Sequence, residues 1–446
     1  MRLALLSLLL AVGASAQAPD GLAGRWSGAA VYEGGALRLL DLEIAVGPDG
    51  LEVVLTQPYG GFARFGFPFA YEPGGPADGF LVAELFGDEM RLLVDLTDGS
   101  LRGTVVTDSV TQATVSLQRV LDYPLPGYTI EPLAFVAGAD SLFGSLVLPE
   151  GPGPFPTALM VPGRGYGYGR GEMSDWALTL VRNGIATFLY DARGTGESSG
   201  VDSLTTGADR VADVQAALDK LAADPRVRAD AVGIVSNSAG GWVTPLAIAD
   251  RDDVAFWVAL VPPAGSLAEQ QSATVRRLMR DSGRPFTEAE FAAATAYQSR
   301  LVSLAAQGAP WSAYAPIIDA ARAQPWAEFA HLPESLADEQ LSYYARRPGF
   351  DNTDALRRMR VPTLAIFGTA DRIVPPEDHV PVLEALQAGN DALNVLVLDG
   401  ADHSLGVPAA AVGEGDWPAG YRRVWGRPGR LFVTLVDWTR QQIGLD

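Results

Sequence analysis

The sequence predicts an α/β protein in which an antiparallel β-domain precedes a mostly parallel sheet with helices on both faces and a helical cap insertion. Three observations predict this class. Residues 20–122 run in strand-length segments separated by turn signals, residues 128–446 alternate apolar runs with amphipathic stretches, and residues 265–356 form one long helical interval. A chain of 446 residues also exceeds what one hydrophobic core usually organises, so two domains are expected.

The first residues are typical of a secretory signal peptide. Arg2 precedes an apolar run from Leu3 to Val12, and Ala14-Ser15-Ala16 supplies small residues at the cleavage positions. We therefore assign residues 1–16 to a signal peptide and expect a periplasmic or extracellular protein; a buried N-terminal helix is the alternative. No later apolar run approaches the roughly 18 residues of a membrane span, so no membrane insertion is expected.

Composition excludes several classes of function. The chain has no cysteine, which rules out a cysteine nucleophile, a thiolate metal site and disulfide bonds. Its formal net charge of -20 argues against nucleic acid or anionic lipid as a partner, because both require a basic surface.

The N-terminal domain, residues 20–122, is predicted to be an antiparallel sandwich or small barrel of roughly eight strands. Its clearest strands are residues 51–56, 80–85, 91–96 and 101–107, with turn signals such as Pro48-Asp49-Gly50 between strands. Trp26 opens the domain, and we interpret its side chain as a plug at one end of a barrel in preference to a ligand contact.

The C-terminal domain, residues 128–446, follows a linker at residues 123–127. Nearly continuous apolar runs predict central strands that are covered on both faces, at residues 158–162, 186–190, 232–236, 255–261, 362–367 and 394–398. Helical spacing of apolar residues predicts helices at residues 175–182, 208–222, 243–249, 380–386 and 431–443.

The interval from residue 265 to residue 356 is too long for a simple crossover and is predicted to form a helical cap over a site at the carboxyl ends of the strands. It contains five widely spaced aromatic residues, and we interpret them as the core of the cap itself: Trp311, Tyr314, Trp326, Tyr343 and Tyr344.

The strongest local signal is the segment Val235–Gly241, which joins a buried strand to a helix. It matches the nucleophile elbow G-x-S-x-G, with Ser236 in place of the first glycine and Ser238 at the centre. An ordinary serine at a glycine-rich helix start is the alternative interpretation. The position of this segment within the series of alternating strands and helices favours Ser238 as a nucleophile.

A serine nucleophile needs a base, and the chain has three histidines. His331 lies inside the predicted cap, and His379 lies at an acidic helix start that is typical of a solvated position. His403 directly follows the last predicted strand, where the order Ser, Asp, His requires the base. His403 is therefore the candidate base.

The acid that orients the base should end the preceding strand, which places Asp371 there. Asp402 is the rival. An aspartate that immediately precedes the histidine reaches its Nδ1 atom only with difficulty, so Asp371 is preferred.

Backbone N–H groups should stabilise the oxyanion of an acyl-transfer reaction. Ala239, next to the nucleophile, is one candidate donor, and Arg164, in the glycine-rich loop Gly163–Gly167, is the other. The same loop could be a phosphate cradle, but it lacks a Walker lysine and the acidic residue that favours a nucleotide.

The loop Asp191–Ser198 has the form D-x-R-G-x-G-x-S. With the elbow and the order Ser238, Asp371, His403, it resembles the α/β-hydrolase superfamily, in particular secreted bacterial esterases and serine peptidases of the S9 and S33 families with an N-terminal β-domain. The opening Gly24-Arg25-Trp26-Ser27-Gly28 likewise resembles the start of the lipocalin-like β-domains of some secreted hydrolases. This resemblance implies an α/β-hydrolase fold and a structural role for the loop Asp191–Ser198. Pro162 departs from the family, because many relatives have histidine there.

These observations predict a serine hydrolase that cleaves carboxylic esters through a Ser-His-Asp triad and an acyl-enzyme, with no metal or organic cofactor. The expected substrate is a small-molecule ester or a short peptide, since a serine peptidase uses the same intermediate. A protein of another class, whose β-domain captures lipid, glycan or a partner protein, is the further alternative. Acyl chain length and oligomeric state stay open.

Overall fold

The computed structural model describes residues 18–19, 21–32, 37–47, 50–56, 64–67, 69–85, 88–107, 110–120, 127–164, 170, 173–406 and 429–445. The predicted signal peptide at residues 1–16 and most of the linker at residues 123–127 lie outside these residues. Contacts divide the chain near residue 124 into an N-terminal and a C-terminal unit, which are described separately.

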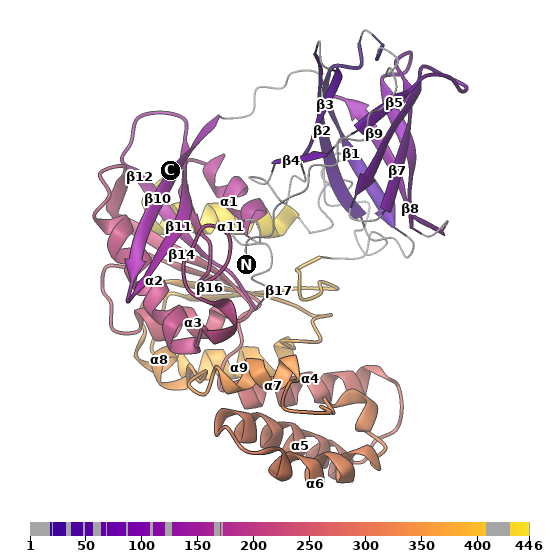
Figure 1. The fold of residues 1–446 in the computed structure, drawn as a ribbon. Coiled ribbons are helices and arrows are strands. Elements are labelled where there is room, and N and C mark those ends of the chain that lie inside the picture. Colours follow the sequence, from indigo (N-terminus) through magenta and orange to yellow (C-terminus); the bar gives the residue numbers. More distant parts are fainter. Residues whose placement is uncertain are drawn as a thin grey trace. The chain divides into compact units, whose positions relative to one another are not determined.

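The N-terminal unit is one antiparallel sheet of nine described strands in the order β4-β3-β2-β1-β9-β8-β7-β6-β5, which curls on itself (Figure 1). The strands are β1 (Gly24–Tyr32), β2 (Leu37–Gly47), β3 (Gly50–Thr56), β4 (Arg64–Phe67), β5 (Phe69–Glu72), β6 (Gly79–Leu85), β7 (Asp88–Asp95), β8 (Ser100–Thr107) and β9 (Val110–Arg119). The sequence predicted about eight strands. The additional strand arises because two short strands, β4 and β5, follow each other with one residue between them. A single curled sheet favours the barrel over the two-sheet sandwich.

Trp26 lies in the core of this unit, fully buried, as a plug would be. Its indole Nε1 donates a hydrogen bond to the carbonyl of Leu22 at 3.0 Å, and the guanidinium of Arg119 lies 5.7 Å from the ring centre. The one polar atom of the indole thus has a partner, so the side chain can be buried without an unsatisfied donor.

The C-terminal unit contains an eight-stranded sheet in the order β10-β11-β13-β12-β14-β15-β16-β17. All pairs from β13 to β17 are parallel, and β10 and β11 form an antiparallel hairpin at one edge. The strands are β10 (Tyr128–Ala137), β11 (Asp140–Pro149), β12 (Phe155–Val161), β13 (Ala186–Tyr190), β14 (Val227–Asn237), β15 (Trp257–Leu260), β16 (Thr363–Gly368) and β17 (Leu393–Leu398). The six predicted central strands all form, whereas β10 and β11 were not predicted.

Two groups of helices cover the sheet. One group pairs α1 (Ser174–Val181) with α11 (Gly429–Gln442), and their rings Trp176 and Phe432 lie 5.5 Å apart. The other is a row formed by α2 (Gly207–Ala222), α3 (Gly240–Ile248), α8 (Thr353–Arg358) and α9 (Pro376–Leu386). The short helix η2 spans Asp202–Leu204. This is the α/β architecture that the sequence predicted.

The insertion between β15 and β16 is helical, as predicted (Figure 1). Before α8 it contains α4 (Leu267–Asp281), α5 (Glu288–Ala306), α6 (Trp311–Arg322), η3 (Ala327–Phe329) and α7 (Glu339–Ala345). Tyr314, Trp326, Tyr343 and Tyr344 are buried, and Trp311 packs against the same core, so these aromatic residues do build the interior.

A buried amide helps to join the two ends of the insertion. The side chain of Asn352 accepts a hydrogen bond from the Gly265 N–H at 2.8 Å and donates to the carbonyls of Pro263 and Gly241, each at 2.9 Å. Asn352 is fully buried, so each of these bonds satisfies a backbone group that water cannot reach.

His379 contradicts the prediction of a solvated histidine. In α9 it shares one buried face with Pro376 and Leu383, and its side chain is only 2 % exposed. The acidic residues that precede it indicated the helix start correctly but not the face on which His379 lies. The helical spacing of these three residues turns the imidazole away from solvent.

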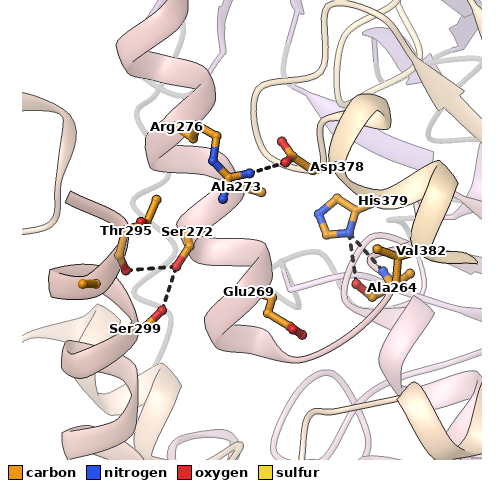
Figure 2. A pocket seen from close by; sticks show the side chains of 11 residues that line it. Ala264, Glu269, Ser272, Ala273, Arg276, Thr295, Ser299, Asp378, His379 and Val382 are labelled. Carbon is orange, nitrogen blue, oxygen red and sulfur yellow. Dashed lines mark hydrogen bonds and ion pairs between the residues drawn. The ribbon is translucent and has the colours of Figure 1, made fainter. Parts of the chain in front are cut away.

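The imidazole of His379 lines a cleft of about 430 Å³ between α4, α5 and α9 (Figure 2). Its Nδ1 atom lies 3.2 Å from both the N and the O atom of Ala264, and its Nε2 atom is buried with no hydrogen-bond partner among the described residues. Nearby, Arg276 forms an ion pair with Asp378 across the cleft. Burial lowers the pKa of His379, so the folded protein favours the neutral imidazole.

We expect this burial to make the protein less stable in acid. Because the folded-state pKa of His379 lies below its ordinary value of 6.5, the unfolded chain binds the additional proton as the pH falls through 6.5. Replacing His379 with glutamine should therefore reduce the loss in unfolding free energy between pH 7.5 and pH 5.5 by about 1 kcal/mol. Urea unfolding at the two pH values measures this loss.

The matched control is His331→Gln, at a cap histidine whose Nε2 atom lies 2.8 Å from Asp338 Oδ1 and whose side chain is one third exposed. This variant should not reduce the unfolding free energy that is lost between pH 7.5 and pH 5.5. If His379→Gln loses as much stability in acid as the parent protein does, burial of the neutral imidazole is not the cause.

Candidate active site

Ser238 lies in the turn between β14 and α3 with a backbone φ of 48°, a left-handed conformation that is rare for residues other than glycine. Two hydrogen bonds hold the turn: the Ser238 N–H donates to Leu260 O at 2.9 Å, and the Gly241 N–H donates to Ser238 O at 2.7 Å. A turn of this kind aims the serine side chain away from the sheet.

The neighbours of Ser238 must be small. A Cβ atom on Gly240 would lie 2.9 Å from Val161 O, and one on Gly241 would lie 2.8 Å from the Pro262 side chain. Ser236 stands where the elbow pattern has its first glycine, and its Oγ atom accepts a hydrogen bond from the Trp257 indole at 2.8 Å. The departure from the pattern is therefore accommodated by a specific partner.

The imidazole of His403 lies between Ser238 and Asp371, the other two candidate residues. The Nε2 atom of His403 lies 2.9 Å from Ser238 Oγ, and its Nδ1 atom lies 2.8 Å from Asp371 Oδ2. Asp371 is fully buried, and its Oδ1 atom accepts hydrogen bonds from the N–H groups of Ile373 at 2.7 Å and Val374 at 2.9 Å. These two bonds satisfy the buried Oδ1 atom and fix the orientation of the carboxylate.

Asp402 does not contact the His403 ring through any described bond; it builds the turn that carries it. Its Oδ1 atom accepts hydrogen bonds from the N–H groups of Ser404 at 2.8 Å and Gly406 at 3.1 Å. This geometry places Asp371, rather than Asp402, as the carboxylate next to the imidazole.

Helix α4 of the cap holds the loop that contains Asp371, which the sequence did not predict. The side chains of Gln270 and Thr274 donate to Ile373 O at 2.6 and 2.9 Å, and the Arg277 guanidinium donates to Thr369 O at 3.0 Å. Both sides of Asp371 are thus fixed from the cap. Nothing in the spacing of these three residues distinguishes them from ordinary polar positions on a helix.

The two candidate oxyanion donors lie in different settings. The N–H of Ala239 precedes the first turn of α3, where backbone donors have no partner within the helix. Arg164 follows β12, and its guanidinium donates to Gln340 Oε1 at 2.5 Å and lies 4.1 Å from the Tyr343 ring centre. Residues 165–169 of this loop lie outside the described residues.

Arg210 of α2 also contacts this loop and was not identified from the sequence. Its Nη2 atom donates to Pro162 O at 2.8 Å and to Gly163 O at 3.1 Å. A sequence signal existed, because Arg210 occupies the helix face of the buried residues Val214 and Ala217, where a cation needs a specific partner.

The loop Asp191–Ser198 has the structural role that was predicted for it. The Asp191 carboxylate accepts hydrogen bonds from the N–H groups of Arg170 and Glu197, each at 3.1 Å. Arg193 is buried, pairs with Asp213 and donates to Ala137 O at 3.1 Å. These contacts link the loop to β10 and α2.

Within the described ranges, no group of three or more His, Cys, Asp or Glu side chains is placed to hold a metal ion. In the part of the chain that the structure describes, no helix is both long and apolar enough to cross a membrane.

Three solved structures illustrate the similarity of this fold to known proteins. A 2,6-dihydroxy-pseudo-oxynicotine hydrolase is 18% identical over 71% of this chain and 68% of its own, with a TM-score of 0.43. An esterase of Pyrococcus furiosus is 16% identical over 62% of this chain and 84% of its own, with a TM-score of 0.41. A puromycin hydrolase is 14% identical over 92% of this chain and 52% of its own, with a TM-score of 0.45.

None of the curated proteins matches the chain in sequence. The model of the family described as serine aminopeptidase, S33, matches residues 155–406, which is more than half of the chain and includes Ser238, Asp371 and His403. The protein therefore belongs to the S33 serine aminopeptidase family of α/β-hydrolases.

Proposed function

We propose that the protein is a serine hydrolase that cleaves carboxylic esters through a covalent acyl-enzyme. One observation carries the proposal: the imidazole of His403 lies between Ser238 Oγ at 2.9 Å and Asp371 Oδ2 at 2.8 Å. Both distances lie within the range for proton transfer between a nucleophile, a base and an orienting acid. The expected substrate is a small-molecule ester.

In the first half of the reaction, Ser238 Oγ bonds to the ester carbonyl carbon while its proton passes to His403 Nε2. The π electron pair of the carbonyl moves to its oxygen, where the N–H groups of Ala239 and Arg164 are the proposed donors. When the oxyanion collapses, the bond to the alcohol breaks and the alcohol leaves with the proton from His403. Asp371 stabilises the imidazolium that forms between these steps.

In the second half, water replaces the alcohol. His403 takes a proton from the water as its oxygen bonds to the acyl carbon, and the second tetrahedral intermediate then releases the carboxylic acid and restores the Ser238 hydroxyl. The chain's own side chains supply every proton transfer in this scheme.

A serine peptidase acting on short peptides is the second candidate, and the family description of a serine aminopeptidase favours it. The same triad would act on an amide, with His403 donating its proton to the leaving amine. From residues 1–16 we further propose that the enzyme works in the periplasm or outside the cell.

Replacing Ser238 with alanine should abolish labelling by a fluorophosphonate probe and lower kcat on a short p-nitrophenyl ester by about 10⁴-fold or more, since the nucleophile is lost. Ser303→Ala, which removes a hydroxyl on α5 that accepts a hydrogen bond from the Gln307 side chain one turn later, is the matched control and should label like the parent protein. Labelling of the Ser238→Ala variant would exclude Ser238 as the nucleophile. A parent protein that neither labels nor turns over any ester would favour a binding protein.

Replacing Asp371 with asparagine should reduce kcat by roughly 10⁴-fold, because the amide cannot stabilise the imidazolium. Asp402→Asn retains the acceptor oxygen of its turn, so kcat should stay within about threefold of the parent value. The reverse pattern, measured on the same ester, would transfer the role of the acid to Asp402.

Short p-nitrophenyl esters and aminoacyl p-nitroanilides, compared by kcat/KM, should separate the two candidates. For an esterase, kcat/KM on the ester divided by kcat/KM on the nitroanilide should be well above the ratio of the uncatalysed hydrolysis rates of the two substrates. Efficient turnover of an aminoacyl nitroanilide, lost when its amine is acetylated, would instead identify an aminopeptidase.

A further inference from the structure

Arg210 holds the backbone that directly follows β12. It lies in the first half of α2, its side chain is 4 % exposed, and its Nη2 atom donates to the carbonyl oxygens of Pro162 at 2.8 Å and Gly163 at 3.1 Å. Two consecutive carbonyls are therefore held by one guanidinium group, which is planar and rigid.

The Gly163 carbonyl and the Arg164 N–H belong to the same peptide unit. A trans peptide is planar, and its C=O and N–H bonds point in opposite directions. A donor that fixes the direction of Gly163 O thus fixes the direction of the Arg164 N–H as well. A cationic donor also polarises the peptide and strengthens the bond that its N–H can donate.

This peptide leaves a strand that packs directly on the nucleophile elbow. A Cβ atom added to Gly240 would lie 2.9 Å from Val161 O and 3.3 Å from Pro162 O, so the end of β12 lies against the first turn of α3. Ala239, the other candidate donor, immediately precedes that turn. The backbone held by Arg210 is therefore adjacent to the elbow.

The side chain of Arg164 is held from the cap. It donates to Gln340 Oε1 at 2.5 Å and stacks on the Tyr343 ring at 4.1 Å, while Arg347 stacks on the same ring at 4.0 Å. Helix α7 thus holds the side chain of Arg164, and Arg210 of α2 holds the Gly163 carbonyl, which shares a peptide unit with the Arg164 N–H.

Burial disfavours the charged form of Arg210. Burial is the main cause that lowers the pKa of Arg210 to about 9, and the neighbouring charge of Arg347 adds to it. Tyr343 and Asp213 raise this pKa. The guanidinium is therefore charged at neutral pH. A positive charge that contacts this loop favours the development of negative charge nearby.

We propose that Arg210 is a positioning residue that aligns the Arg164 N–H toward the oxyanion of the tetrahedral intermediate. The inference deepens the proposed serine hydrolase function and rests on it. Arg210 touches no reacting atom; it acts through the Gly163–Arg164 peptide.

Arg210→Met tests this role, because methionine keeps much of the apolar stem and donates no hydrogen bond. On a short p-nitrophenyl ester, kcat should fall by about 10²-fold, as on loss of one oxyanion donor, while KM changes by less than about threefold. Loss of a merely structural contact would lower thermal stability without this split between kcat and KM.

An alkyl trifluoromethyl ketone provides a second measurement. Ser238 Oγ adds to its carbonyl, the proton passes to His403, and the oxygen becomes an oxyanion like that of the intermediate. Its inhibition constant should rise by about the factor by which kcat falls in Arg210→Met. The matching methyl ketone without fluorine, which forms little adduct, should bind the two proteins equally.

Arg228→Met is the matched control, since Arg228 also donates to a backbone carbonyl, that of Ile443, at the opposite end of β14. Its kcat, KM and inhibition constants should stay within about twofold of the parent values. If Arg210→Met does not fold, Arg210→Leu, which likewise donates no hydrogen bond, is measured in its place.

A folded Arg210 variant with the parent kcat and the parent affinity for the trifluoromethyl ketone would overturn the proposal and leave the hydrolase function intact. Failure of the parent protein itself to react with a fluorophosphonate would overturn both, and it is recognised before any Arg210 variant is made.

Discussion

The two hydrogen bonds of the His403 imidazole impose the constraint on which the rest of the C-terminal unit depends. They join side chains that follow β14, β16 and β17. The loops that carry Ser238 and Asp371 must therefore both bring a side-chain oxygen to within 3 Å of the His403 ring. A parallel sheet meets this requirement because all its strands end at the same edge. The register between β14, β15, β16 and β17 thus decides whether Ser238 and Asp371 reach the ring at all.

The loops that carry these side chains are held from outside the sheet. Cap helix α4 binds both sides of Asp371 through Ile373 O and Thr369 O, while Arg210 and helix α7 hold the loop that follows β12. Backbone conformations such as the positive φ of Ser238 persist only where the surroundings determine them fully. The cap therefore contributes to the geometry of the candidate site from two directions.

The sequence predicted the features that depend on local pattern and chain order. Six parallel strands, the cap interval and the order Ser238, Asp371, His403 were all visible, because the strands are largely apolar and each candidate side chain follows one. The prediction that all six are covered on both faces was wrong for β17, which lies at the sheet edge with Asn394 and Val397 exposed. The hairpin β10–β11 alternates exposed and buried residues and gives a weaker signal. The burial of His379 and the contacts of Gln270 and Arg210 depend on which helix face meets which loop, and spacing alone does not determine that pairing.

Asn352 gives the cap a further property. Its amide bonds to Gly265, which is 87 positions earlier in the chain, and so brings the two junctions of the insertion to one point of the sheet edge. A segment whose ends are joined in this way behaves as a module, because changes in its length or sequence leave the anchoring strands β15 and β16 where they are. The entropic penalty of closing such a loop grows only slowly with its length. Exchange of the module for one of different size is thus an accessible evolutionary route to new substrates on an unchanged sheet.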